Sequence, residues 1–136
     1  MDALYATAAG IPAFLLYFIV ALVFAAVFAG LYVQITPQHE ISLIRDGNRA
    51  AAISFAGALI GFALPLAKSI EQSRNLADML VWSAVALLVQ LLAFFIASLV
   101  APALGRRISA GDEAAAIVAA AVAIGIGLLN AACMTY

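Results

Sequence analysis

Four long stretches without a charged residue divide this chain. They cover residues 13–34, 50–67, 79–104 and 114–136. A helix needs roughly 20 apolar residues to cross the hydrocarbon core of a bilayer, and buried strands are much shorter. Because backbone polar groups in lipid must be bonded within the segment, each stretch is expected to be helical. The sequence therefore predicts an all-α membrane protein with four transmembrane helices, in a single integral membrane domain over residues 1–136.

The composition supports lipid as the solvent. Apolar residues make up 68% of the chain and charged residues 10%, whereas soluble domains have roughly 45–50% and 25%. The net charge of −1 indicates neither nucleic acid nor an anionic surface as a partner. With one cysteine and one histidine, the chain has no Cys/His cluster for a metal or haem. It also lacks catalytic motifs, so no catalytic residue, metal, cofactor or enzyme activity is predicted.

The ends of the spans carry local signals. Pro37 and Pro102 are expected to mark the ends of the first and third helices, because proline lacks the N–H that a helix interior needs. Asn48 and Asp112 precede the second and fourth spans, and both residue types are strong N-caps. Asp78 is expected to cap the third span in the same way.

The loops suggest an orientation. No Lys or Arg precedes the first loop, so the N-terminal stretch lacks the basic region of a secretory signal and is interpreted as a retained span. The loop between the second and third spans contains Lys68 and Arg74. The first and third loops hold more positive charge, in Arg45, Arg49, Arg106 and Arg107. Positive loops stay inside, so both termini are expected to be periplasmic.

The two halves of the chain resemble each other. Residues 44–53 (IRDGNRAAAI) match residues 108–117 (ISAGDEAAAI). In the preceding spans, Tyr17 corresponds to Trp82 and Pro37 to Pro102. The pattern predicts two tandem two-helix repeats, at about 13–70 and about 78–136. Because each repeat has two spans, both would insert in the same direction, related by an axis along the membrane normal.

Small residues mark helix-packing faces. Gly57 and Gly61 form a GxxxG motif in the second span, and Ala121 and Gly125 repeat this spacing in the fourth. Such spacing places small residues on one helix face and lets backbones approach closely. Two interpretations follow: packing between helices of one chain, or self-association of chains through this face.

Gln90 is the most polar residue in the middle of a span. An amide in lipid costs several kcal/mol, on the order of its transfer free energy, if it finds no partner. Pro65 deprives the carbonyl of Gly61 of its helical donor. We therefore expect the Gln90 amide to donate to that carbonyl or to its neighbours, as a structural hydrogen bond. The alternative is a polar permeation or ligand site that includes Ser54 and Asn130.

The first loop contains the other candidate polar residues. Residues 37–46 are predicted to form either a short interfacial helix or a solvated loop. Glu40 lies beside His39 and near Arg45 in this loop. A local ion pair at the membrane surface is one interpretation, and a headgroup or ion-entry site is the other.

Four motifs of the chain are distinctive: ITPQHE at 35–40, GALIG at 57–61 with Pro65, ALLVQLL at 86–92 and NAACMTY at 130–136. With these motifs the chain resembles the YjfL family of small bacterial inner-membrane proteins. The resemblance covers nearly the whole chain. It implies a bacterial inner-membrane location and four spans from a duplicated two-span unit, and it implies no molecular activity.

The functional prediction is a non-enzymatic, homo-oligomeric membrane module with a structural or partner-binding role. The lipid bilayer is its environment, and its protein partner is not identified by the sequence. The alternative is a small channel with a polar path near Gln90. Four short helices enclose little polar interior, so such a path would form between protomers.

Overall fold

The computed structural model describes residues 1–135, which contain α-helices and no strand. Four helices are long: α2 (Ile11–Ile35), α4 (Arg49–Gln72), α5 (Leu76–Val100) and α7 (Glu113–Cys133). All four are long and apolar enough to cross a membrane, and α1 (Asp2–Ala9) extends the first candidate span to Asp2–Ile35. The predicted all-α fold with four membrane-spanning helices is confirmed.

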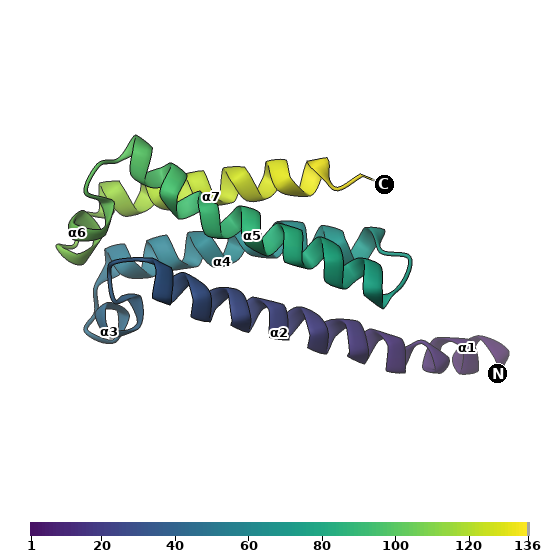
Figure 1. Cartoon of the computed structure of the whole chain (residues 1–136). Coiled ribbons are helices and arrows are strands. Elements are labelled where there is room, and N and C mark those ends of the chain that lie inside the picture. The colour runs from purple at the N-terminus through teal and green to yellow at the C-terminus, as the bar shows by residue number, and fades with distance from the viewer. Residues whose placement is uncertain (136) are drawn as a thin grey trace.

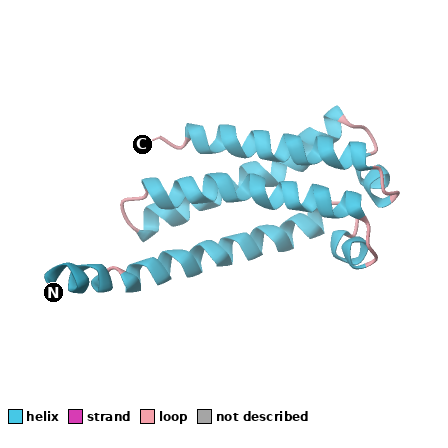
Figure 2. Ribbon diagram, turned by 180° about the vertical axis from the view of Figure 1, so that it is seen from behind, coloured by secondary structure: helices cyan, strands magenta, loops and turns pink. Residues whose placement is uncertain are grey.

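Two short helices, α3 (Glu40–Arg45) and α6 (Leu104–Ser109), lie at the same end of the molecule (Figure 1). Each connects one long helix to the next, so the first loop is partly helical, as one of the two alternatives predicted. Both chain ends and the α4–α5 connection lie at the opposite end (Figures 1 and 2). Successive long helices therefore run antiparallel, and the two termini share one side.

The starts of α4 and α7 are built in the same way. Gly47 and Gly111 have φ angles of 83° and 85°, a left-handed conformation that favours glycine. The side chains of Asn48 and Asp112 then accept hydrogen bonds from the backbone N–H groups of Ala51 and Ala115, at 3.0 and 3.2 Å. The two predicted N-caps are confirmed.

The core lies where α4, α5 and α7 pack together, and α2 joins them near the α3 end. Phe28 of α2 stacks on Phe62 of α4 with ring centroids 4.6 Å apart. Only Phe28 and Tyr32 of α2 are buried. Toward its N-terminus α2 diverges from the other helices (Figures 1 and 2). Within the apolar stretch of the first span, 11% of the residues are buried, whereas 50% are buried within that of α4.

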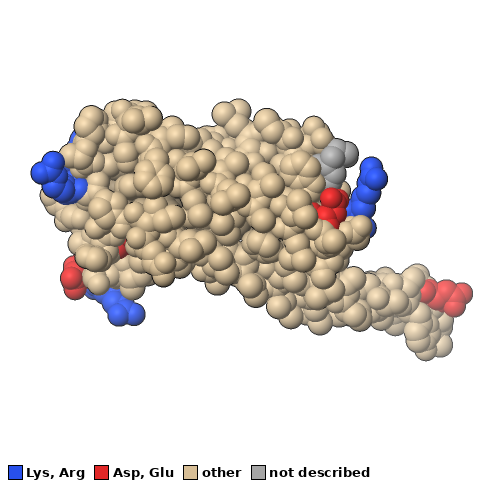
Figure 3. All heavy atoms as spheres, viewed as in Figure 1, with Lys and Arg blue, Asp and Glu red and all other residues tan. Residues whose placement is uncertain are grey.

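The exposed surface between the two ends is apolar. On the face shown in Figure 3, Lys, Arg, Asp and Glu lie at the ends of the molecule, with an uncharged belt between them. Large hydrophobic side chains of the long helices are more than half exposed, among them Ile19, Leu22, Leu88, Leu92 and Leu129. Lipid tails solvate such a surface without penalty, whereas water does not. The chain is an integral membrane protein.

Candidate functional site: buried polar groups and the loop end

The GxxxG motif of α4 packs against α7 within the same chain. A Cβ added at Gly57 would overlap the Cα of Ala120, and one added at Gly61 would overlap the carbonyl of Ala123. On α7, a Cβ added at Gly127 would overlap the carbonyl oxygen of Gly61. These glycines permit the two helix backbones to touch, which is the role expected of small residues in membrane helices.

The α7 face that carries Ala121 and Gly125 does not pack within the chain, so of its two interpretations only self-association stays a prediction. Ala121 is exposed, and no atom lies within 4 Å of the position a Cβ would take at Gly125. Ala123 and Gly127 meet α4 instead. Two residues along a helix correspond to a rotation of about 200°, so the face that carries Gly125 points away from α4.

Gln90 donates to a carbonyl that lies beside Gly61 and not to the Gly61 carbonyl itself. Its side chain is 2% exposed, and Nε2 donates to the carbonyl of Ala123 in α7 at 3.1 Å. The expected acceptor, the carbonyl of Gly61, lies under Gly127. Pro65 is buried inside α4, as expected for a residue within the span. Gln90 Oε1 has no partner among the described residues.

Other polar side chains inside the spans also bond the protein itself. Ser54 is 1% exposed and donates to the carbonyl of Ala51 in its own helix. Asn130 is half-buried, and its Nδ2 reaches the carbonyl of Ala86 at 3.5 Å. Ser69 and Ser83 share a hydrogen bond of 2.8 Å between α4 and α5, which sequence reasoning missed. Both residues are serines in apolar helices, at similar distances from the α4–α5 turn. That spacing was the sequence signal that could have predicted their contact.

The chain between α2 and α3 turns three polar side chains inward. Thr36, Gln38 and Glu40 are 5%, 2% and 0% exposed, whereas the alternate residues Pro37 and His39 are exposed. The chain bends at residues 36–38, so the alternation belongs to this local turn and not to a strand. His39 is the N-cap residue of α3, and its side chain makes no capping hydrogen bond.

Glu40 does not form the predicted surface ion pair. Its Oε1 accepts a hydrogen bond of 2.6 Å from the Thr36 hydroxyl, which also lies 3.0 Å from the carbonyl of Tyr32. Glu40 Oε2 and both side-chain polar atoms of Gln38 have no partner in the described part of the chain. Burial raises the pKa of Glu40, and the Thr36 hydrogen bond opposes this only in part. Sequence position placed Glu40 at the surface, but the fold covers it.

The second short helix lies against this segment. A Cβ added at Gly105 of α6 would lie 3.1 Å from Gln38 Oε1 and would press on Pro37. The Asn48 side chain donates to the carbonyls of Ile108 and Ser109, at 3.1 and 3.2 Å. These carbonyls lie at the end of α6, where helical donors run out, and that of Ile108 also accepts from the Gly111 N–H at 3.0 Å. The two loops are thereby joined into one layer at this end.

Two ion pairs of the described residues lie in the same layer. Arg49 and Glu113 approach to 3.4 Å between the starts of α4 and α7, with both side chains well exposed. Arg107 bonds Asp112 at 2.8 Å and, together with the N-cap hydrogen bond, holds the pKa of that carboxyl below its usual range. Exposed pairs of this kind contribute little to stability.

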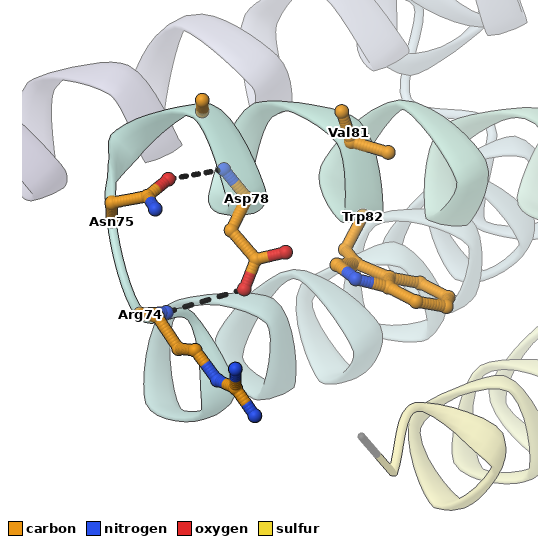
Figure 4. A pocket seen from close by; sticks show the side chains of 6 residues that line it. Arg74, Asn75, Asp78, Val81 and Trp82 are labelled. Atoms are coloured by element: carbon orange, nitrogen blue, oxygen red, sulfur yellow. Dashed lines mark hydrogen bonds between the residues drawn. The ribbon is translucent and has the colours of Figure 1, made fainter.

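At the opposite end, Asp78 has a different role from the one predicted. Asn75 is the N-cap of α5, and its side chain accepts from the Asp78 N–H at 2.9 Å. Asp78 Oδ2 in turn accepts from the Arg74 N–H at 3.2 Å (Figure 4). Asp78 therefore supports the cap from the first turn of the helix. Asn75 and Asp78 border a surface pocket of ≈ 550 Å³, which is also lined by Arg74, Ala77, Val81 and Trp82.

Comparison with known proteins gives one family. Residues 6–134 match the model of the Domain of Unknown Function (DUF350) family. The "UPF0719 inner membrane protein YjfL" of Escherichia coli (strain K12) is 36% identical over 124 residues, covering 91% of this chain and 94% of that protein. The "UPF0719 transmembrane protein YshE" of Bacillus subtilis (strain 168) is 24% identical over 118 residues, covering 85% and 88%. No solved structure matches the chain.

Proposed function

The chain belongs to the DUF350 family, and on this premise we propose that it is a non-enzymatic structural module that assembles with a second copy of itself in the bacterial inner membrane. The location rests on the name of the E. coli relative. The proposed assembly rests on α7, the helix that closes one side of the core. Its protein partner, if it has one besides itself, is not indicated by any described residue.

The observation that carries the proposal is the open small-residue face of α7. Ala114, Ala121 and Ala132 are exposed on it, and Gly125 has no neighbour within 4 Å of a Cβ position. The corresponding glycines of α4 are covered by α7, so the chain already uses one such face for close packing. In lipid, small residues on a helix favour association because the backbones can approach. A second α7 presents the same face, and a two-fold axis satisfies both copies.

The buried polar groups favour this role over a channel. Gln90 and Ser54 are buried and bonded to backbone carbonyls, and Asn130 points to the backbone of α5. A residue that lines a water-filled path keeps its polar atoms available to water or ions. These three side chains support helix packing within the chain instead.

Cysteine cross-linking in native membranes tests the assembly. In a Cys133→Ser background, which removes the single cysteine, we expect Gly125→Cys to form a disulfide-linked dimer on mild oxidation. Gly30→Cys is the matched control, because no atom lies within 4 Å of the position that a Cβ would take at Gly30 on α2. Equal cross-linking of both variants, or of neither, contradicts the proposal. Ion or solute flux through liposomes containing the purified chain would instead support the channel.

A further inference from the structure

Glu40 is a carboxyl group enclosed by protein, and it has no salt bridge within the described residues. Its side chain is 0% exposed, and the ion pairs of the described residues involve Arg49 and Arg107 with other acids. Arg45, in the same short helix, is exposed. Burying an isolated ionised carboxylate is so costly that such a group normally becomes neutral. Either a proton or a bound cation must therefore compensate Glu40.

The groups around Glu40 do not stabilise a charge well. The Thr36 hydroxyl has one hydrogen, which both Glu40 Oε1 and the Tyr32 carbonyl can accept. Tyr32 of α2 and His39 at the start of α3 are the titratable neighbours that act on Glu40 or feel its charge. On the side of α6, the residue that lies against Pro37 and Gln38 is Gly105, which carries no charge. Burial accordingly raises the pKa of the Glu40 carboxyl.

We propose that Glu40 is a proton-binding site, which keeps α3 docked when it holds a proton and releases α3 when it ionises. The ligand is a proton from the aqueous phase on the side of α3 and α6. Bound at Oε2, it makes the carboxyl neutral and turns its unpartnered oxygen into a donor. Gln38 Oε1 is also buried and without a partner among the described residues, and it is the candidate acceptor for this proton.

Release of α3 is possible because little of the helix is buried. Of its six residues, Glu40 alone is fully buried, and Leu43 and Ile44 pack against the core while partly exposed. It is bounded by Pro37 on one side and by Gly47, with a φ of 83°, on the other. Once Glu40 is charged, moving this short segment into water costs less than keeping an unpaired carboxylate inside. The long helices need not move.

The sign of the pH dependence follows from the raised pKa. A carboxyl whose pKa is higher when docked stabilises the docked state most at low pH. That contribution is lost as the pH rises from the ordinary glutamate pKa, roughly 4.3, through the raised value. Within this window the docking equilibrium falls by about tenfold per pH unit, because one proton is released.

The test uses the full chain in lipid nanodiscs. Hydrogen–deuterium exchange of Glu40–Arg45 is followed from acid to alkaline pH, with correction for the intrinsic exchange rate. We expect wild-type protection to fall as the pH rises, whereas Glu40→Gln, which mimics the protonated acid, keeps its protection at every pH. Glu71→Gln is the matched control, since Glu71 is an exposed glutamate at the opposite end, and it should behave as wild type.

Infrared spectroscopy gives a second readout that does not depend on variant folding. In the docked wild type we expect a carbonyl band of a protonated carboxylic acid, and Glu40→Gln should lack it. If Glu40→Gln fails to fold, the wild type alone still tests the proposal. As the pH rises, its protonated-acid band and its α3 protection should disappear together. Protection without a protonated-acid band overturns the proposal. So does protection that depends on sodium, potassium or magnesium relative to choline, which would identify a metal cation as the ligand.

Discussion

Gln90 Nε2 donates a hydrogen bond to the Ala123 carbonyl across the α5–α7 interface, over 3.1 Å. A helical carbonyl normally accepts from the residue four positions on, so this is an additional bond between helices. It gives the buried amide N–H an acceptor in the apolar core, and it ties α5 to the helix that packs on the glycines of α4. The bond is thus a structural feature of the bundle.

Replacement of Gln90 by leucine should weaken the bundle modestly. The variant loses one interhelical hydrogen bond, worth about 0.6–2 kcal/mol in membrane proteins, but it also removes the unpartnered Oε1. We expect a net loss of about 1 kcal/mol or less in the free energy of unfolding, measured by denaturation in mixed micelles. Gln34→Leu, at an exposed position of α2, is the control. A loss of several kcal/mol would mean that Gln90 has further partners.

Gly61→Ala should be much more damaging than its size suggests. The added methyl overlaps the Ala123 carbonyl and lies 2.8 Å from Gln90 Nε2. We expect a loss of about 1–3 kcal/mol from overpacking, seen as a lower thermal stability in detergent. Gly30→Ala is the matched control: nothing lies within 4 Å, so alanine should be neutral or stabilising by up to about 1 kcal/mol. Equal effects of the two changes would refute the close α4–α7 contact.

Asn48→Asp separates two functions of one side chain. Aspartate retains the acceptor that caps α4 at Ala51 but cannot donate to Ile108 and Ser109. We expect α4 to keep its start while α6 loses protection from hydrogen exchange, with a cost of about 1 kcal/mol. Asn48→Ala should also fray α4, since it removes the cap. If α6 exchange is unchanged in Asn48→Asp, the two loops are not coupled through this residue.

The orientation remains a prediction, and reporter fusions can test it. Arg45, Arg49, Arg106 and Arg107 lie at or beside the two short helices, whereas Lys68 and Arg74 lie at the other end. The bias of positive charge predicts that the end with α3 and α6 is cytoplasmic. Alkaline phosphatase fused after Tyr136 should then be active, and a fluorescent protein fused there and exported unfolded should be dark. The reverse result would place both termini in the cytoplasm.

The tandem repeat also remains a prediction. Each half of the chain contains a long helix, a short helix and a second long helix, with Gly47-Asn48 and Gly111-Asp112 at matching positions. The halves differ in their packing, however. The glycines of α4 are covered by α7, while the corresponding Gly125 of α7 is open. A duplicated origin explains the shared local signals and leaves the two faces free to diverge.

The sequence by itself determined the four spans and the starts of α4 and α7. Length and hydropathy decide whether a segment resides in lipid, and caps such as Asn48 and Asp112 act within one helical turn. The tertiary structure alone decided which carbonyl Gln90 bonds, which face of α7 meets Gly61, and that Glu40 is covered. These depend on how each helix is rotated about its axis and on which distant segment closes over it. Each helix carries apolar residues on most of its faces, so hydropathy does not favour one rotation of the helix over another.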